Sequence, residues 1–346
     1  TTEIYTLSLH DALPICFLVS RTDRAGDLIL TLPVFRELRK CFAEAHIVAH
    51  VRSYTAPLLK LCPEVDEIVI DDHYPAGLLS SPLNQAFQKL TIDHCFIVHP
   101  AGRAILAAWR AGISRRSGRA SNIWQVLLND RHVQKRSRNE KHEFCYNLDL
   151  LSRTVTNIDY SPYHFMLTDE QRAAGAAAIK NLGLLRPVVI HPGHGGSAHN
   201  ISTGRYAELA EMLIKQGQSV LISLGPGEEK LKSFFEPCKS DKLNFLCNVP
   251  DLAALAEVFS ACAAFVGGST GPLHLAAALQ LPTVAFFPPV AAMTPKRWGP
   301  VGNRSLVLKP DMSYCNGRCD NCASKGCMAS IALEPAQEWL LKELKA

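Results

Sequence analysis

Short apolar segments alternate along this chain with segments whose apolar residues recur every three or four positions. The first apolar segment, at residues 16–21, ends at a turn, and residues 24–42 then carry apolar side chains at helical spacing, among them Leu28, Leu32 and Phe35. Strands separated by helices, with few hairpin signals, predict a parallel α/β sheet.

The same alternation occurs twice, on either side of an aperiodic segment at residues 157–170, which contains Pro162 and is the predicted linker. In the first half we expect further strands at residues 45–52, 67–72 and 94–100 and helices at 55–61, 82–90, 104–112 and 141–154. In the second half we expect strands at residues 187–193, 219–225, 244–249, 264–268 and 283–289 and helices at 169–182, 205–217, 228–237, 251–262, 272–280 and 335–346. We therefore predict two Rossmann-like, doubly wound domains facing a central cleft, at residues 16–160 and 161–333, with a C-terminal helix at 334–346.

The length of 346 residues agrees with two domains, and 47% hydrophobic with 20% charged residues excludes a disordered chain. No apolar run reaches the ~18 residues of a membrane-spanning helix, and no secretory signal precedes the first strand. Residues 1–15 fit no element and resemble a translated cloning adaptor, so we expect a non-native leader there. The net charge of +4 is too small to indicate a nucleic-acid binder by itself.

Ligands of such sheets bind at the carboxyl ends of the strands, which directs attention to the loops that follow them. Residues 21–27 (RTDRAGD) follow the first strand, and Asp27 falls in the first turn of the next helix. Its carboxylate either complements the helix dipole or serves as a general base facing the cleft. Arg21 and Arg24 either hold an anionic substrate or are solvated surface charges.

Two loops of the second half are candidates for binding a diphosphate. Residues 191–200 (HPGHGGSAHN) leave backbone amides free to approach a phosphate, although the loop matches no Walker or dinucleotide motif. Residues 267–274 (GGSTGPLH) place donors at a helix N-terminus, which is a ready anion site. The candidate donor-binding residues in these loops are Gly193, Gly195, Gly196, Ser197, His199, Ser269, Thr270, Gly271 and His274.

The same loops can also be explained without a ligand. The glycine loop serves equally for a tight turn, and His274 equally for packing within its helix. Glu228, which follows another strand, either accepts from sugar hydroxyls or is an exposed acid at a helix N-terminus. Two donor-rich loops in one domain favour the diphosphate site.

Residues 103–141 contain ten Lys or Arg and only two acids. This basic segment is either a solvated face or, as we favour, a surface for an anionic acceptor or an anionic membrane. Nucleic acid is a third option, but aromatic residues are sparse there. With Arg21 and Arg24, Arg52 and Arg103 are the candidate acceptor-binding residues.

No metal is expected at the diphosphate, because no two aspartates occur at D-x-D spacing. Four of the 12 cysteines, Cys315, Cys319, Cys322 and Cys327, cluster near the C-terminus. Unligated thiols or a disulfide are the favoured interpretation. A structural zinc site is the alternative, and an iron–sulfur cluster is disfavoured because few residues follow.

Taken together, the loops resemble glycosyltransferase family 9, the bacterial heptosyltransferases, which have the two-domain GT-B fold. The resemblance runs from about residue 16 to the C-terminus. It is carried by RTDRAGDLILTLPVFREL, HEFCYNLDLL, HPGHGGSAHN with RYAELA, SLGPGEE, GGSTGPLHLAAAL, PKRWGPVGN and the Cys327-Met328 pair.

The resemblance implies inverting transfer of a heptose from ADP-heptose onto the lipopolysaccharide inner core, without a required cofactor. Asp27 matches the proposed base of the family, Arg21 a basic acceptor-binding position, Glu228 the ribose-binding acid, and residues 269–274 the diphosphate loop. Two motifs differ: His199 to Ser202 replace Lys-Asn-Trp-Pro, and Gly268 to Pro272 replace Asn-Asp-Ser-Gly-Pro. A histidine thus stands where the family often has a cation.

The acceptor implied is anionic and lipid-linked, so we expect a cytoplasmic protein in peripheral contact with the inner face of the membrane and no nucleic-acid partner. One alternative is a GT-B enzyme that uses another nucleotide sugar, such as an epimerase. The other is a non-catalytic nucleotide-sugar or zinc-containing binding protein.

Overall fold

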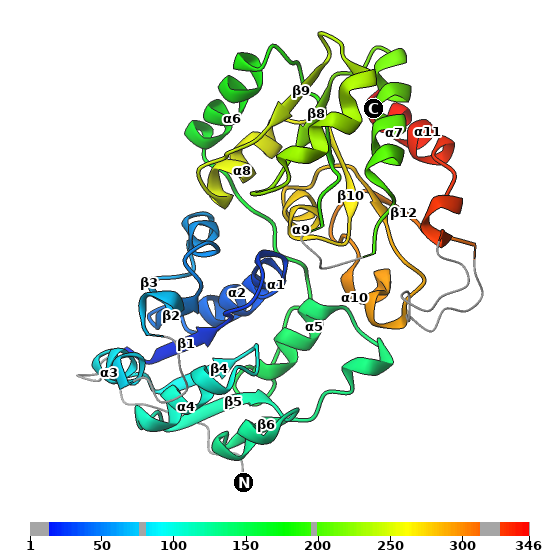
Figure 1. Cartoon of the computed structure of the whole chain (residues 1–346). Helices are drawn as coiled ribbons and strands as arrows, with labels where there is room; N and C mark the ends of the chain where they lie inside the picture. The colour runs from blue at the N-terminus through cyan, green and yellow to red at the C-terminus, as the bar shows by residue number, and fades with distance from the viewer. Residues whose placement is uncertain (1–13, 76–80, 195–198, 312–325, 346) are drawn as a thin grey trace.

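The computed structural model describes residues 14–75, 81–194, 199–311 and 326–345. Two α/β domains lie one above the other, joined by the segment that follows α5 (Figure 1). Each domain contains an all-parallel sheet, as predicted, and each sheet has six strands. The two-sheet α/β architecture is therefore confirmed.

The first sheet has the order β3-β2-β1-β4-β5-β6. Its strands are β1 Cys16–Ser20, β2 His46–Val51, β3 Glu67–Ile70, β4 His94–Ile97, β5 Arg115–Arg119 and β6 Asp130–His132. The strand order reverses between β1 and β4, and ligands of open α/β sheets bind at that switch point. The loops after β1 and β4 both emerge there.

The second sheet repeats this plan in the order β12-β11-β10-β7-β8-β9. Its strands are β7 Val188–His191, β8 Val220–Ser223, β9 Leu243–Leu246, β10 Ala264–Gly268, β11 Thr283–Phe286 and β12 Ser305–Leu308. Here the order reverses between β7 and β10. The two loops predicted to bind a diphosphate therefore leave adjacent strands at the switch point.

Helices cover both sheets. Those of the first domain are α1 Ala25–Ile29, α2 Leu32–Cys41, α3 Ser81–Lys89, α4 Gly102–Arg110 and α5 Glu143–Leu148. Those of the second are α6 Asp169–Asn181, α7 Thr203–Lys215, α8 Leu252–Ser260, α9 Gly271–Ala278, α10 Pro295–Trp298 and α11 Glu334–Glu343. The 3₁₀ segments are η1 Ala56–Leu61, η2 Asp71–His73, η3 Ile123–Leu127, η4 Arg136–Arg138, η5 Asp149–Leu151, η6 Glu229–Cys238, η7 Ala291–Met293 and η9 Cys327–Ser330.

The single helix predicted for residues 24–42 is wrong, because the chain breaks there into α1 and α2. Pro33 stands in the first turn of α2, where its missing N–H costs nothing, but inside one long helix it would remove a hydrogen bond. Thr31 stabilises the break, since its hydroxyl donates to the carbonyl oxygen of Asp27 over 2.8 Å. The short α1 therefore ends just after Asp27.

Other departures concern short elements. Residues 55–61 and 228–237 form the 3₁₀ segments η1 and η6 rather than α-helices. Strands β5, β6 and β12 were not predicted. β5 reads RRSGR and β6 reads DRH, so neither has an apolar run, and the short SLVL run of β12 was overlooked. In β5 the two buried positions are Ser117 and Gly118, so no apolar run marks it.

One hydrophobic cluster crosses from the first domain into the second. It contains Phe35 of α2, Leu150 of η5, Phe165 of the linker and Leu273 of α9, all buried. The linker is fixed rather than loose, because Arg36 donates to the carbonyl oxygen of Pro162 over 3.0 Å. The C-terminal helix α11 buries Ala336 and Leu340 in the core of the second domain.

Candidate active site

The loop after β1 is organised around a buried arginine. The Arg21 side chain is only 4% exposed, and its Nε and Nη2 donate to Asp23 Oδ1 at 2.7 Å and to Asp27 Oδ1 at 2.5 Å. Its backbone N–H also donates to the carbonyl oxygen of His50 over 2.9 Å. Arg21 thus fixes two carboxylates at the switch point, and its side chain is not displayed on the surface.

Asp27 lies in the first turn of α1, at the junction of the two domains. Burial raises the pKa of its carboxyl group to about 6, and the negative charges of Asp23 and Glu143 act in the same direction, while the positive charge of Arg21 opposes them. The side chain remains 18% exposed, so Asp27 is largely but not completely buried. A carboxyl group of this kind can exchange a proton near neutral pH.

Asp23 and His99 form a second pair at this edge, which the sequence analysis missed. His99 follows β4, and its Nδ1 lies 3.2 Å from Asp23 Oδ2 while the ring stays 41% exposed. Burial alone would raise the pKa of Asp23, but the hydrogen bond with His99 and the charge of Arg21 lower it below the ordinary value. The rule that ligands bind at strand carboxyl ends would have pointed to His99.

The four predicted acceptor-binding arginines fall into two kinds. Arg24 and Arg52 are exposed, and neither makes an ion pair with a residue that the structure describes. Arg103, like Arg21, is engaged within the fold, since it lies 3.4 Å from Asp71 Oδ2 and donates to the carbonyl oxygens of Asp71 and Tyr74. Arg24 and Arg52 are the free cations of this set.

Only part of the basic segment at residues 103–141 is displayed as a charged surface. Arg115 pairs with Asp130, Arg116 donates to the carbonyl oxygens of Leu127 and Ile113, and the buried Arg136 pairs with Glu143. The prediction of a surface for an anionic acceptor or an anionic membrane therefore stays a prediction, for the arginines and lysines of this segment that remain exposed. The paired arginines fix β5, β6 and η4, because a short charged strand needs internal partners.

In the second domain, Glu228 lies over the start of the glycine loop. Its Oε2 accepts from the N–H of Gly225 over 2.8 Å, and a β-carbon at Gly193 would overlap the Glu228 carboxylate. Gly193 is thus required by this arrangement for close approach, not only for a turn. Gly195, Gly196 and Ser197 lie outside the described residues, and His199 is exposed.

The N-terminus of α9 follows β10 and carries no side-chain cap. Thr270 occupies the N-cap position without capping the helix, and its hydroxyl donates instead to the carbonyl oxygen of Gly268 over 3.4 Å. Asn200 lies against Gly268, where a β-carbon would be 2.6 Å from its Nδ2. Ser269 is half-buried beside Thr270 and Gly271. Uncapped amides at a helix N-terminus favour an anion.

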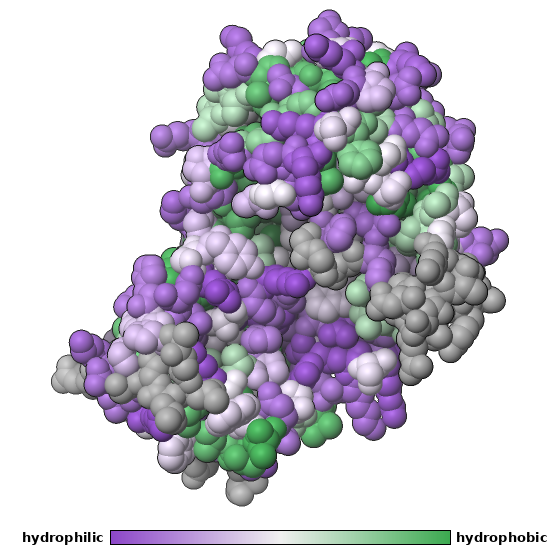
Figure 2. All heavy atoms as spheres, viewed as in Figure 1, coloured by the Kyte–Doolittle hydropathy of each residue, from purple (hydrophilic) through white to green (hydrophobic). Residues whose placement is uncertain are grey.

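The helices α1 and α9 meet at two glycines. A β-carbon at Gly26 would lie 2.7 Å from His274 Cδ2, and one at Gly271 would lie 3.4 Å from the backbone nitrogen of Gly26. This contact brings Asp27 close to the N-terminus of α9. In Figure 2 the surface is hollowed between the domains, and hydrophilic residues dominate the hollow.

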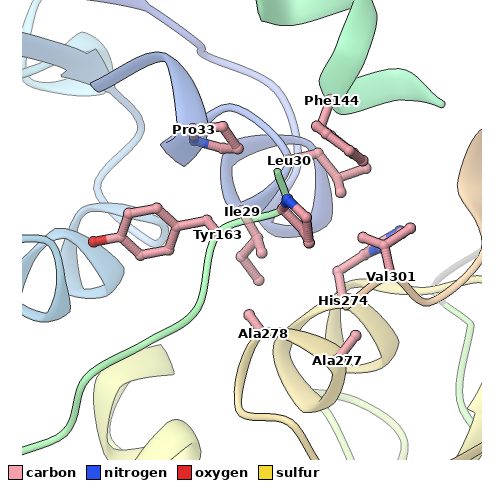
Figure 3. A pocket seen from close by; sticks show the side chains of 10 residues that line it. Ile29, Leu30, Pro33, Phe144, Tyr163, His274, Ala277, Ala278 and Val301 are labelled. Atoms are coloured by element: carbon pink, nitrogen blue, oxygen red, sulfur yellow. The ribbon is translucent and has the colours of Figure 1, made fainter. Parts of the chain in front are cut away.

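His274 belongs to this contact between the domains. Its side chain is buried, and burial, followed by the nearby His142, lowers its pKa to about 3, so the ring is neutral. It lines a small apolar cavity of about 10 Å³ with residues of both domains, including Ile29, Phe144 and Val301 (Figure 3). The structure thus gives His274 a packing position, and its predicted contact with a diphosphate stays a prediction.

A buried carboxylate links the domains beside this contact. Glu143 is 1% exposed and accepts from Arg136 of the first domain and, over 2.8 Å, from Arg297 Nε of the second. His142 adds a hydrogen bond of 3.0 Å to the carbonyl oxygen of Gly299. The HEFCYNL and PKRWGP motifs, far apart in sequence, therefore meet here.

The cysteine cluster falls mainly outside the described residues, which include only Cys327, a partly buried thiol at the start of η9. Among the described residues, no group of three or more His, Cys, Asp or Glu is arranged to hold a metal ion. In the same part of the chain, no helix combines the length and the apolar character needed to cross a bilayer.

Comparisons with known proteins agree on one family. The model of glycosyltransferase family 9 (heptosyltransferase) matches residues 103–327. A Haemophilus influenzae protein that is named as an inferred glycosyltransferase is 30% identical to this chain over 299 residues. The match covers 83% of this chain and 86% of the relative. Lipopolysaccharide heptosyltransferase 2 of Escherichia coli is 24% identical, over 93% of this chain and 95% of that protein.

Among solved structures, the E. coli ADP-heptose lipopolysaccharide heptosyltransferase II superposes with a TM-score of 0.76 at 19% identity. The match covers 96% of this chain and 98% of that one. The fold is therefore GT-B, as the sequence analysis expected.

The bridge at Glu143 leads to a prediction about stability. The substitution Glu143→Gln leaves the buried Arg136 and the largely buried Arg297 without their shared negative charge, so we expect the free energy of unfolding to fall by about 3 to 5 kcal/mol in urea denaturation. In a protein that already carries Arg297→Gln, Glu143→Gln should lower the free energy of unfolding by a smaller amount.

Glu140→Gln provides the matched control. Glu140 is 61% exposed and lies 3.6 Å from an exposed Arg138, so its loss should change stability by less than about 0.5 kcal/mol. Equal, small effects of the two substitutions would show that the domain junction does not depend on the buried bridge.

Proposed function

The chain belongs to glycosyltransferase family 9, the heptosyltransferase family, and on that basis we propose that it moves a heptose from ADP-heptose to the inner core of lipopolysaccharide. It is a glycosyltransferase of the heptosyltransferase type. The names of the E. coli relatives supply the donor and the acceptor of the proposal. The observation that carries it is a largely buried carboxylate, Asp27, on the helix that contacts the uncapped N-terminus of α9 in the opposite domain.

In the proposed reaction Asp27 acts as the general base. Its carboxylate takes the proton of an acceptor hydroxyl, and the hydroxyl oxygen forms a bond to the anomeric carbon as the bond from that carbon to the diphosphate breaks. Attack from the face opposite the leaving group inverts the anomeric centre. The ion pair with Arg21 occupies Oδ1 and leaves Oδ2 as the proton acceptor.

The leaving diphosphate is stabilised by the second domain without a metal or other cofactor in this proposal. The backbone amides of Ser269, Thr270 and Gly271, at the N-terminus of α9, donate to the diphosphate in this proposal, and the helix dipole favours its negative charge. Glu228 accepts hydrogen bonds from the ribose, and the exposed His199 replaces the cation that often stands near the diphosphate in the family. Gly193, Gly195, Gly196 and Ser197 let the loop approach the phosphates.

The acceptor in this proposal is anionic and lipid-linked. Arg24, just before α1, and Arg52, just after β2, are exposed and would contact it, while Arg21 and Arg103 shape the loops around it. Because such an acceptor is anchored in a bilayer, the protein works in the cytoplasm in peripheral contact with the inner face of the membrane. Nucleic acid has no part in this function.

Asp27→Asn tests the base. The amide keeps the shape of the side chain but accepts a proton far less readily, so transfer should be abolished while nucleotide affinity stays nearly intact. For the unsubstituted protein, kcat/KM should fall as pH drops through about 6, since the base acts only when ionised and burial raises its pKa to that value. The measurements are initial rates across pH and calorimetric titration with ADP.

Transfer by the Asp27→Asn variant within about tenfold of the unsubstituted enzyme would argue against a base role. So would an acid limb near pH 4, where an unperturbed aspartate titrates.

Gly193→Ala tests the donor site. Its β-carbon would occupy the space of the Glu228 carboxylate, so ADP affinity should fall at least about tenfold in titration calorimetry, and ADP should bind the unsubstituted protein more tightly than UDP or GDP. Gly204→Ala is the control, because this exposed residue near the start of α7 has its nearest neighbour at 3.9 Å. Equal affinity for the three nucleotides, or an unaffected Gly193→Ala variant, would contradict the proposal.

A further inference from the structure

Exposed aliphatic side chains gather on one part of the first domain. Ile123 and Val126, both on η3, are 78% and 65% exposed, and Val133, just after β6, is 80% exposed. Side chains three residues apart on a 3₁₀ helix point the same way, so Ile123 and Val126 share one face. Isolated exposed aliphatic residues are common, but a group of three within eleven positions indicates an interaction surface.

The edge strand β6 and the residues after it add cations near this surface. Arg131 of β6 and Lys135, which lies between β6 and η4, are both exposed, as is Val133 between them. Arg131 is thus the strand residue that η3 can be compared with, and Val133 and Lys135 follow it within four positions. Arg131 Nε also donates to the carbonyl oxygen of Leu128, directly after η3, over 3.1 Å.

The sheet register places Arg131 on the side that η3 covers. Arg131 is paired with Gly118 of β5, and a β-carbon at Gly118 would lie 2.9 Å from Leu128 Cδ1. Gly118 therefore points toward the end of η3, and Arg131 points to the same side. We call Ile123, Val126, Arg131, Val133 and Lys135 the η3–β6 patch. At the foot of the first domain, beside β6, Figure 2 shows hydrophobic residues exposed next to hydrophilic ones.

The η3–β6 patch begins at the same sheet edge as Asp27. The residue before η3, Asn122, donates to the carbonyl oxygen of Pro100, which follows β4, over 2.9 Å. Val133 follows the carboxyl end of β6. The patch and the candidate base thus belong to the same sheet and face its carboxyl end. Asp27 follows β1, and β4 and β5 lie between β1 and β6.

We propose that the η3–β6 patch docks the protein onto an anionic lipid bilayer. Aliphatic side chains enter the boundary between headgroups and acyl chains, while neighbouring Lys and Arg side chains attract anionic headgroups. The inference deepens the proposed function and rests on it, because a lipid-linked acceptor stays in the bilayer while its sugar reaches Asp27. Pairing of two copies of the chain through the edge strand β6 is disfavoured, because Arg131 and Lys135 of one copy would meet the same cations of the other.

Co-sedimentation with lipid vesicles tests the docking surface. The unsubstituted protein should sediment with vesicles of phosphatidylethanolamine and phosphatidylglycerol, less with phosphatidylcholine alone, and less at high salt. The double substitution Ile123→Asp with Val126→Asp should reduce partitioning into the anionic vesicles at least about tenfold, and Arg131→Glu with Lys135→Glu should do the same.

The matched control is Met166→Asp with Leu185→Asp, two side chains that are 80% and 82% exposed outside the first domain. This variant should partition like the unsubstituted protein. Thermal unfolding and ADP affinity of the Ile123→Asp, Val126→Asp variant should match those of the control, which excludes misfolding as the cause.

The inference is overturned if the unsubstituted protein ignores anionic vesicles, or if the patch and control variants lose binding equally. It is also overturned if sedimentation velocity shows that the aliphatic substitutions only convert a dimer to a monomer. Transfer to a delipidated core oligosaccharide separates the two proposals: the Ile123→Asp, Val126→Asp variant should keep it. If no variant, and not the unsubstituted protein either, transferred sugar to this oligosaccharide, the proposed function would be refuted. Binding to vesicles would then be judged by the sedimentation results only.

Discussion

The close approach of α1 and α9 is the constraint on which the rest of the site depends. Gly26 and Gly271 have no side chains, and this absence lets the two short helices touch across the domain junction, with His274 packed on Gly26. Asp27 follows Gly26 directly, so the contact holds the proposed base next to the N-terminus of α9, the proposed anion site. A side chain at Gly26 would collide with the His274 ring and push the two helices apart.

Buried charge beside this contact serves the same arrangement. Glu143 holds arginines from both domains, and its negative charge helps burial to raise the pKa of Asp27 while Arg21 limits the rise. Buried ion pairs are seldom a net source of stability compared with apolar packing. Here the apolar cluster that crosses the junction already joins the domains, so the charges are better explained by the electrostatics of the site.

Much of the fold could be predicted because apolar strands and amphipathic helices alternate so regularly. Asp27, Gly193 and Thr270 follow β1, β7 and β10 at the switch points of the two sheets, as the sequence predicted, while their roles stay predictions. The sequence could not reveal β5, because the strand has no apolar run and Arg115 is held by residues farther along the chain, Asp130 and Arg153. It also missed the break at Pro33, where a local residue overrides the helical period. The burial of His274 and the pairing of Asp23 with His99 arise only when loops from different strands meet.

A crystal structure of the protein with ADP tests the central claim most directly. The account predicts that the diphosphate lies within hydrogen-bonding distance of the amides of Thr270 and Gly271, with the open carboxylate oxygen of Asp27 facing the space beyond the terminal phosphate. A diphosphate bound away from α9, or an Asp27 side chain shut off from that space, would contradict it.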